Sequence, residues 1–234
     1  MCTMTLCMIT PEFIPVWGGT GSYTIELIKH LPKNVDIHVV TLKRSILGVP
    51  EIDPTDIFGS ILNRTIKTHY ISIAKETFFY NLPFQMACLR NVPLLHRKYK
   101  FDIIHSHHCH MPDVFLQLFR RIRVPNVVTV HNTIAELKAG EIASGVRLGD
   151  LEWSEKQVIT FYPLLRVLEL LYARHISRFI AVSNSAKNGI IKYLKVEAER
   201  ISTVYNGVDT KLFRPPRKNE MEKRKKNEFL ATSS

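Results

Sequence analysis

Long apolar runs are the first thing this sequence lacks. No stretch approaches the roughly 18 consecutive apolar residues of a membrane-spanning helix. The first residues do not show a basic segment followed by an apolar core and a cleavage site, so no secretory signal is predicted. Cysteine is also scarce: four in 234 residues do not make a disulfide framework (Cys2, Cys7, Cys88 and Cys109). We therefore expect a cytoplasmic protein, with peripheral membrane association as the open alternative.

Acidic residues are too few to balance the basic ones. The chain has 32 Lys and Arg against 21 Asp and Glu, a formal net charge of +11, of which +4 falls within residues 214–228. It carries no helix-turn-helix, zinc-finger or RNA-recognition signature, so no nucleic-acid partner is predicted. The surplus favours an anionic membrane surface or a phosphate-bearing ligand. It is explained equally well if a more acidic domain belongs to the same protein.

Short runs of aliphatic and β-branched residues are abundant. Most are continuous rather than alternating, which is typical of parallel strands covered on both faces. They predict strands at residues 5–10, 35–42, 66–73, 101–105, 127–131, 179–182 and 201–205.

Helical patterns separate these runs. Apolar spacing predicts a helix around residues 24–31 with Ser22 as its N-cap. Further helices are predicted at residues 83–98, 112–121, 163–175 and 185–194, with Pro163 in the first helical position of one. Alternating strands and helices imply right-handed crossovers. The predicted fold class is α/β, with a doubly wound, mostly parallel Rossmann-like sheet.

Five polar turns follow the predicted strands in a fixed order. In a doubly wound sheet the carboxyl ends of the strands open onto one crevice, so residues far apart in sequence converge there. The turns therefore predict one composite site. They are residues 15–21 (PVWGGTG), 102–107 (DIIHSH), 129–132 (TVHN), 181–185 (AVSNS), and 206–209 (NGVD) with 213–215 (FRP).

The first turn is rich in glycine. Gly18, Gly19 and Gly21 lie between a strand and a helix, where glycine permits positive φ and lets a ligand approach the backbone. A helix N-terminus behind them suits a phosphate or carboxylate. The turn is not Gly-x-Gly-x-x-Gly, and no acidic residue follows the second strand at residues 42–44, which argues against a nicotinamide dehydrogenase. A glycine turn without any ligand is the alternative interpretation.

The second turn runs into a histidine cluster, HSHHCH at residues 105–110. Adjacent side chains of an extended segment point to opposite faces, so at most His105, His107 and Cys109 share a side. Zinc ligation is one interpretation, although structural zinc sites usually pair ligands at wider spacing. The other is that a single histidine acts on substrate while His105 and His110 are packed or solvated.

The order of these turns and the residues in them resemble the N-terminal domain of family-4 glycosyltransferases. These are retaining sugar-nucleotide enzymes of GT-B fold. The resemblance covers residues 4–215. The resemblance implies a nucleotide diphosphate sugar as donor and a hydroxyl acceptor that is a sugar, a lipid-linked molecule or a small molecule. It implies no cofactor and no metal. His107 then stands beside the reacting sugar as the catalytic residue. The other implied contacts to substrate are made by Gly18, Gly19, Gly21, His131, Asn132 and Ser183.

Composition and resemblance together suggest one domain and a remnant. We expect an acceptor-binding domain at residues 1–215, followed by a basic linker and the start of an absent C-terminal donor domain at residues 216–234. Such a chain is expected to be inactive alone. Two other classes remain open: a non-catalytic sugar- or lipid-binding module, and a nucleotide-dependent epimerase or reductase. The latter needs a Tyr-x-x-x-Lys pair, and Tyr193 and Lys195 have the wrong spacing.

Two apolar stretches bear on a membrane partner. Residues 78–100 place aromatics beside a basic cluster, and residues 161–175 have only a narrow polar stripe at Arg166, Glu169 and Arg174. Such patterns suit docking on anionic lipid. Core packing is the more common explanation and remains the alternative.

Overall fold

The computed structural model describes residues 4–14, 18–44, 62, 64–74, 81–108, 111–119, 121–146, 153–210 and 213–215. Its centre is a seven-stranded sheet in which every pairing is parallel, in the order β3-β2-β1-β4-β5-β6-β7. The strands are β1 Met4–Ile9, β2 Val35–Arg44, β3 Lys67–Ala74, β4 Ile103–His107, β5 Asn126–Val130, β6 Arg178–Ala181 and β7 Ile201–Thr203. All seven sequence-predicted strands are confirmed, with ends shifted by up to two residues.

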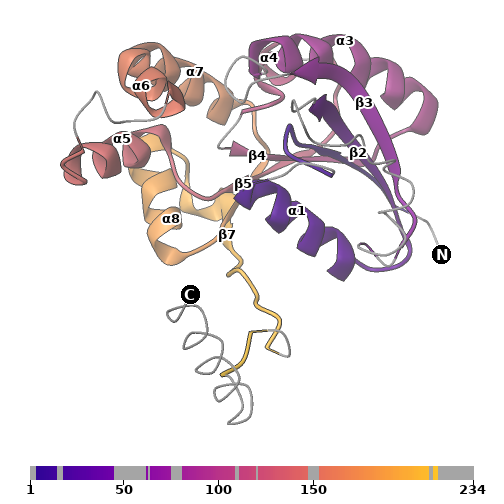
Figure 1. Cartoon of the computed structure of the whole chain (residues 1–234). Helices are drawn as coiled ribbons and strands as arrows, with labels where there is room; N and C mark the ends of the chain where they lie inside the picture. The colour runs from indigo at the N-terminus through magenta and orange to yellow at the C-terminus, as the bar shows by residue number, and fades with distance from the viewer. Residues whose placement is uncertain are drawn as a thin grey trace, which may run out of the picture. The chain divides into compact units, whose positions relative to one another are not determined.

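Helices cover both faces of this sheet (Figure 1). They are α1 Gly19–His30, α3 Asn81–Tyr99, α4 Val114–Leu118, α5 Ile134–Ala143, α6 Trp153–Thr160, α7 Tyr162–Arg174 and α8 Asn184–Gly189, which passes into a π-helix, Ile190–Leu194. A short 3-10 helix, Ala198–Arg200, precedes β7. The doubly wound α/β prediction is confirmed.

Burial on both faces explains why the strands read as continuous apolar runs. In β1, Leu6 and Met8 pack in one cluster with α1, whereas Cys7 and Ile9 pack in a second cluster with α3. A third cluster joins β5 and β6 to α4, α7 and α8. Each large aliphatic side chain removed from water in this way stabilises the fold by about 1.5–3 kcal/mol.

A buried polar network ties the outer helices to the middle of the sheet. Tyr172 of α7 donates to Asp113 over 2.5 Å, and Gln117 of α4 donates to the same carboxylate over 2.7 Å. Asn126 at the start of β5 donates to Gln117 over 2.6 Å. Burial raises the pKa of Asp113, although the hydrogen bonds from Tyr172 and Gln117 oppose the shift. The network therefore fixes α4 and α7 relative to β5.

Helices α5 and α6 have no counterpart in the sequence prediction, and two further helical details differ from it. The N-cap of α1 is Gly18 rather than Ser22, whose hydroxyl lies inside the first turn and donates to the Gly18 carbonyl over 3.1 Å. On α7, Glu169 is fully buried and Arg166 partly buried, so these two do not form an outward polar stripe. Leu164, Val167 and Leu171 face solvent instead.

The chain divides into two compact units, residues 1–204 and 205–234. The first contains the whole sheet and its helices. In the second, the described residues of the NGVD turn are exposed and form neither helix nor strand. Among the residues that can be described, no helix is both long and apolar enough to cross a membrane.

Candidate active site at the carboxyl edge of the sheet

The strand order places the topological switch point of the sheet between β1 and β4. From β1 the chain moves outward through β2 and β3, then returns to the other side of β1 with β4. In open α/β sheets, ligands bind outside the carboxyl ends of the strands at such a switch point. The glycine turn follows β1, and His107 is the last residue of β4, so the two strongest sequence candidates flank this switch point.

His107 is held by α1. Its ring is buried, and its Nε2 lies 3.0 Å from the hydroxyl of Thr24. That hydroxyl donates its one proton to the Thr20 carbonyl over 2.9 Å, so it accepts from His107 Nε2–H. A neutral His107 ring therefore carries its lone pair on Nδ1. This is the form that can accept a hydrogen bond from a sugar hydroxyl.

Aromatic rings join His107 to the next strand end. His131 follows β5, and its ring stacks on His107 with centroids 5.9 Å apart. Tyr23 of α1 meets both histidines edge-on, with ring centroids 5.4 Å from His107 and 5.0 Å from His131. Tyr23 and His131 are partly buried, whereas His107 is buried, so Tyr23 and His131 are the more accessible of the three side chains.

The glycine turn already holds an anion. The amides of Gly18 and Gly21 donate to the carboxylate of Glu12, over 3.2 Å and 3.3 Å. A Cβ at Gly18 would stand 2.9 Å from that carboxylate, whereas one at Gly19 would meet nothing within 4 Å. Among the described glycines only Gly145 has positive φ, so the sequence argument from backbone conformation is wrong here. What the turn needs at position 18 is room for Glu12.

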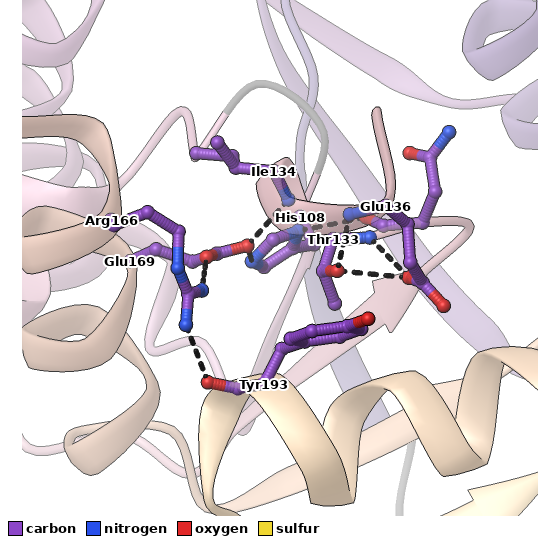
Figure 2. A network of polar contacts seen from close by, with 8 residues as sticks. His108, Thr133, Ile134, Glu136, Arg166, Glu169 and Tyr193 are labelled. Atoms are coloured by element: carbon purple, nitrogen blue, oxygen red, sulfur yellow. Dashed lines mark hydrogen bonds and ion pairs between the residues drawn. The ribbon is translucent and has the colours of Figure 1, made fainter. Parts of the chain in front are cut away.

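The next residue of the histidine cluster faces a different set of partners (Figure 2). His108 Nδ1 lies 3.2 Å from the Asn132 carbonyl, and its Nε2 lies 3.1 Å from the carboxylate of Glu169. Glu169 also accepts from the amide of Ile134 over 2.9 Å and pairs with Arg166. Burial alone raises the pKa of Glu169, but the hydrogen bonds from His108 and Ile134 and the charges of His108 and Arg166 outweigh it, so the pKa is lowered.

The remaining candidates have structural partners. Ser183 caps α8 by accepting from the amide of Ala186 over 3.0 Å, which confirms its capping interpretation. His105 is buried and bonds Thr129 over 2.8 Å. His105 and His107 do share a side, with stacked rings 5.5 Å apart. Cys109 and His110 lie outside the described residues, and within the described part no group of His, Cys, Asp or Glu is arranged to hold a metal ion.

His107 and His131 are thus recognisable in the sequence, but the residues around them are not. Tyr23 and Thr24 looked like ordinary helix residues, and Glu12 like a strand-end residue. A signal was present: Glu12 precedes the glycines by six residues, and an acidic side chain close to a helix N-terminus is favoured electrostatically. The directions of the side chains on α1 become known only when the helix is packed on the sheet.

A comparison with protein families decides the relationship. The profile of glycosyltransferase family 4 matches residues 17–212. The chain belongs to glycosyltransferase family 4. That span contains every site candidate named above except Glu12, so the family match and the geometry concern the same edge of the sheet.

Curated relatives of this family-4 domain are distant in sequence. The D-inositol 3-phosphate glycosyltransferase of Streptomyces bingchenggensis is 27% identical over 205 residues, which are 85% of this chain and 40% of that protein. The corresponding protein of Frankia alni is 32% identical over 204 residues, or 45% of its length. The MMP alpha-(1->4)-mannosyltransferase of Mycolicibacterium hassiacum is 28% identical over 138 residues, 59% of this chain and 30% of that protein. The chain therefore spans less than half of the length of these relatives.

Solved structures agree on the fold. Sucrose-phosphate synthase from Thermosynechococcus elongatus superposes with a TM-score of 0.60 and 15% identity, over 91% of this chain and 50% of that chain. HepE from Anabaena, solved with UDP and glucose, gives a TM-score of 0.56 and 14% identity over 95% of this chain and 50% of that chain. The family-4 domain thus has the fold of one half of a GT-B glycosyltransferase.

Proposed function

We propose that this domain is the acceptor-binding half of a retaining glycosyltransferase, which moves a sugar from a nucleotide diphosphate sugar to a hydroxyl group. The observation that carries the proposal is His107 at the end of β4, beside the switch point of a family-4 domain. The chain spans 40–45% of the inositol-phosphate transferases it resembles, so most donor contacts are assigned to a second domain.

In this proposal the roles follow from the contacts. His107, with Nε2–H fixed by Thr24, is the catalytic residue that accepts from a hydroxyl of the reacting sugar and supports developing positive charge as a neutral ring. His131 and Asn132 contact the acceptor. Gly18, Gly19 and Gly21 line the approach of the donor phosphates and the acceptor, and Ser183 lies toward the second domain. These roles need neither a cofactor nor a metal.

The acceptor is proposed to be a sugar, a lipid-linked molecule or a small molecule. Two of the curated relatives are named for D-inositol 3-phosphate, a small phosphorylated cyclitol, and this supports the last class. Phosphorylated acceptors would also suit the formal net charge of +11. To bind at the glycine turn, however, an anionic group of the ligand must displace the Glu12 carboxylate, because that carboxylate already accepts hydrogen bonds from the amides of Gly18 and Gly21.

An anionic membrane surface is a second proposed partner, favoured by the outer face of α3. This helix contains no Asp or Glu, and its exposed residues alternate between apolar Leu82 and Leu94 and basic Arg90, Arg97 and Lys98. A helix with this pattern suits the boundary of an anionic bilayer, where each nearby Lys or Arg contributes about 1 kcal/mol.

A non-catalytic binding module is the alternative function. It would use the same edge of the sheet without group transfer. The family match gives no support to the epimerase or reductase alternative, which requires a nicotinamide fingerprint that the glycine turn does not have.

The test is a screen of nucleotide sugars and hydroxyl acceptors with the domain joined to a family-4 donor domain. We expect one donor to be consumed with a glycosidic product whose anomeric configuration, read by NMR, equals that of the donor. Inversion would contradict the retaining mechanism. Ligand binding without any transfer or donor hydrolysis would favour the binding module.

A further inference from the structure

His108 stands between two groups that can only accept hydrogen bonds. Its Nδ1 is 3.2 Å from the Asn132 carbonyl oxygen, and its Nε2 is 3.1 Å from Glu169 Oε1. The Asn132 carbonyl oxygen can only accept, so Nδ1 carries a proton, whereas Nε2 faces the Glu169 carboxylate at ion-pair distance without the alignment of a hydrogen bond. A buried carboxylate at this distance favours a positive charge on the ring.

Glu169 is the centre of the arrangement. It is fully buried on α7 and receives the Ile134 amide, His108 and the guanidinium of Arg166 (Figure 2). Arg166 also donates to the Tyr193 carbonyl over 2.8 Å, which ties α7 to the π-helix after α8. The Glu169 carboxylate thus connects the end of β4 with the start of α5, with α7 and, through Arg166, with the π-helix.

The segment held by this cluster is the one that follows His131. Its backbone is fastened at three successive residues: Asn132 by His108, Thr133 by Glu136 over 2.8 Å, and Ile134 by Glu169. Thr133 and Glu136 complete a capping box at the start of α5. His131, immediately before these anchors, stacks on His107, the residue next to His108.

We propose that His108 is a positioning residue, which as an imidazolium paired with Glu169 fixes the backbone of residues 132–134 and thereby places His131 and Asn132 beside His107. His108 touches no substrate in this account. Its catalytic consequence rests on the function proposed above, whereas its charge state and its hold on the segment do not.

Nuclear magnetic resonance of the chain, with ¹⁵N in its histidine rings, tests the charge state. At pH 7.5 we expect both ring nitrogens of His108 to be protonated. In Glu169→Gln the ring should lose one proton, because Arg166 then faces it without a counter-charge. A wild-type His108 with a single protonated nitrogen would overturn the proposal, as would two protonated nitrogens that persist in Glu169→Gln.

Amide hydrogen exchange tests the hold on the segment. In His108→Gln the amides of Thr133 and Ile134 should exchange at least about tenfold faster, since a charge-assisted hydrogen bond is lost. The control is Val92→Ala, which opens a cavity on α3 in a different core cluster. Equal acceleration in the two variants, compared at matched global stability, would reduce His108 to an ordinary structural residue.

The catalytic consequence is read in the two-domain enzyme. His108→Gln should raise the KM for the acceptor about tenfold while the KM for the donor stays unchanged. Equal changes in both constants would contradict a role on the acceptor side. If the wild-type enzyme transfers no sugar, the proposed function fails, but the ring nitrogens and amide exchange still decide whether His108 holds the segment.

Discussion

Four histidines in the described part of the chain are buried, and each has a different polar environment. His38 lies 3.0 Å from His69, and His105 bonds Thr129. His107 bonds Thr24, whereas His108 lies between a carbonyl and a carboxylate. Two of the four contact a carboxylate: His38 Nε2 lies 3.3 Å from Asp36, and His108 Nε2 lies 3.1 Å from Glu169. Acid should therefore affect these residues unequally.

The stability of the domain should fall as the pH drops below 6.5. Burial lowers the pKa of His105 from 6.5 to about 4, so between these values the unfolded chain binds the extra proton and is favoured. The pKa of His69 is also lowered to about 4, and that of His38 is lowered, in both cases mainly by burial. His105 alone accounts for about 3 kcal/mol lost by pH 4. Urea unfolding between pH 7.5 and 4.5 should show less pH dependence in His105→Gln, and an unchanged slope would contradict this account.

The glycine turn offers a matched pair of substitutions. Gly18→Ala should displace the Glu12 carboxylate, because the new Cβ would stand 2.9 Å from it, and should cost about 1 kcal/mol of stability. Gly19→Ala meets no atom of the protein within 4 Å and should leave the free energy of unfolding within about 0.5 kcal/mol of the wild type or raise it. Thermal unfolding of both variants measures the difference. Equal costs would show that Glu12 does not hold the turn.

Helix α7 shows where periodicity is informative and where it is not. The pattern predicted the helix and nearly its ends, since Pro163 and the leucine spacing are local signals. It did not predict which face is buried. Glu169 and Arg166 look like solvent-facing charges in the sequence, but they turn inward because each neutralises the other and His108 provides a third partner. Leu164 and Leu171 are left exposed to solvent on this helix.

Substitutions on α7 should therefore reverse the usual expectation for leucine. Leu164→Gln with Leu171→Gln should change the free energy of unfolding by less than about 1 kcal/mol, because both side chains face solvent. Leu165→Gln on the same helix packs against the core and should cost more than about 2 kcal/mol. Chemical denaturation compares the variants. A large loss in the double variant would mean that another part of the protein covers this face.

The same double variant addresses the proposed membrane partner. If α3 and α7 dock on anionic lipid, the wild type should co-sediment with phosphatidylserine vesicles at low salt, and the bound fraction should fall as ionic strength rises, because the Debye length shrinks to about 10 Å at 0.1 M. Leu164→Gln with Leu171→Gln should weaken binding without unfolding the protein. If the wild type does not bind these vesicles at low salt, the proposal of a membrane partner is wrong.

At the scale of the whole molecule, the sequence predicted the sheet better than the site. The apolar runs are strong signals because the inner strands β1, β2, β4 and β5 are largely buried, and parallel topology brings the turns after the strands to one edge. The site depends on the orientation of individual side chains: the directions of Tyr23 and Thr24 on α1, and the contact of the Glu12 carboxylate with the glycine turn. These follow from helix packing on the sheet, which no local pattern encodes.

The chain alone should fold cooperatively but transfer no sugar. Its sheet and its three core clusters are complete within residues 1–204, which predicts a single unfolding transition. Transfer requires both reactants at near-attack distance, and the solved relatives contain about as much chain again as this domain covers. Calorimetric unfolding and titration with nucleotide sugars should give one transition and very weak binding. Transfer by the purified chain would contradict the assignment of donor binding to a second domain.

The central claim is that His107 stands at the reaction centre, and the turnover of a two-domain enzyme carrying His107→Ala tests it most directly. We expect kcat to fall by roughly 10²-fold or more, the usual contribution of a positioned proton-transfer group, while circular dichroism shows a folded protein. His69→Gln, a partly buried histidine on the edge strand β3, should keep turnover close to that of the wild type. A folded His107→Ala enzyme with near-normal turnover would contradict the account.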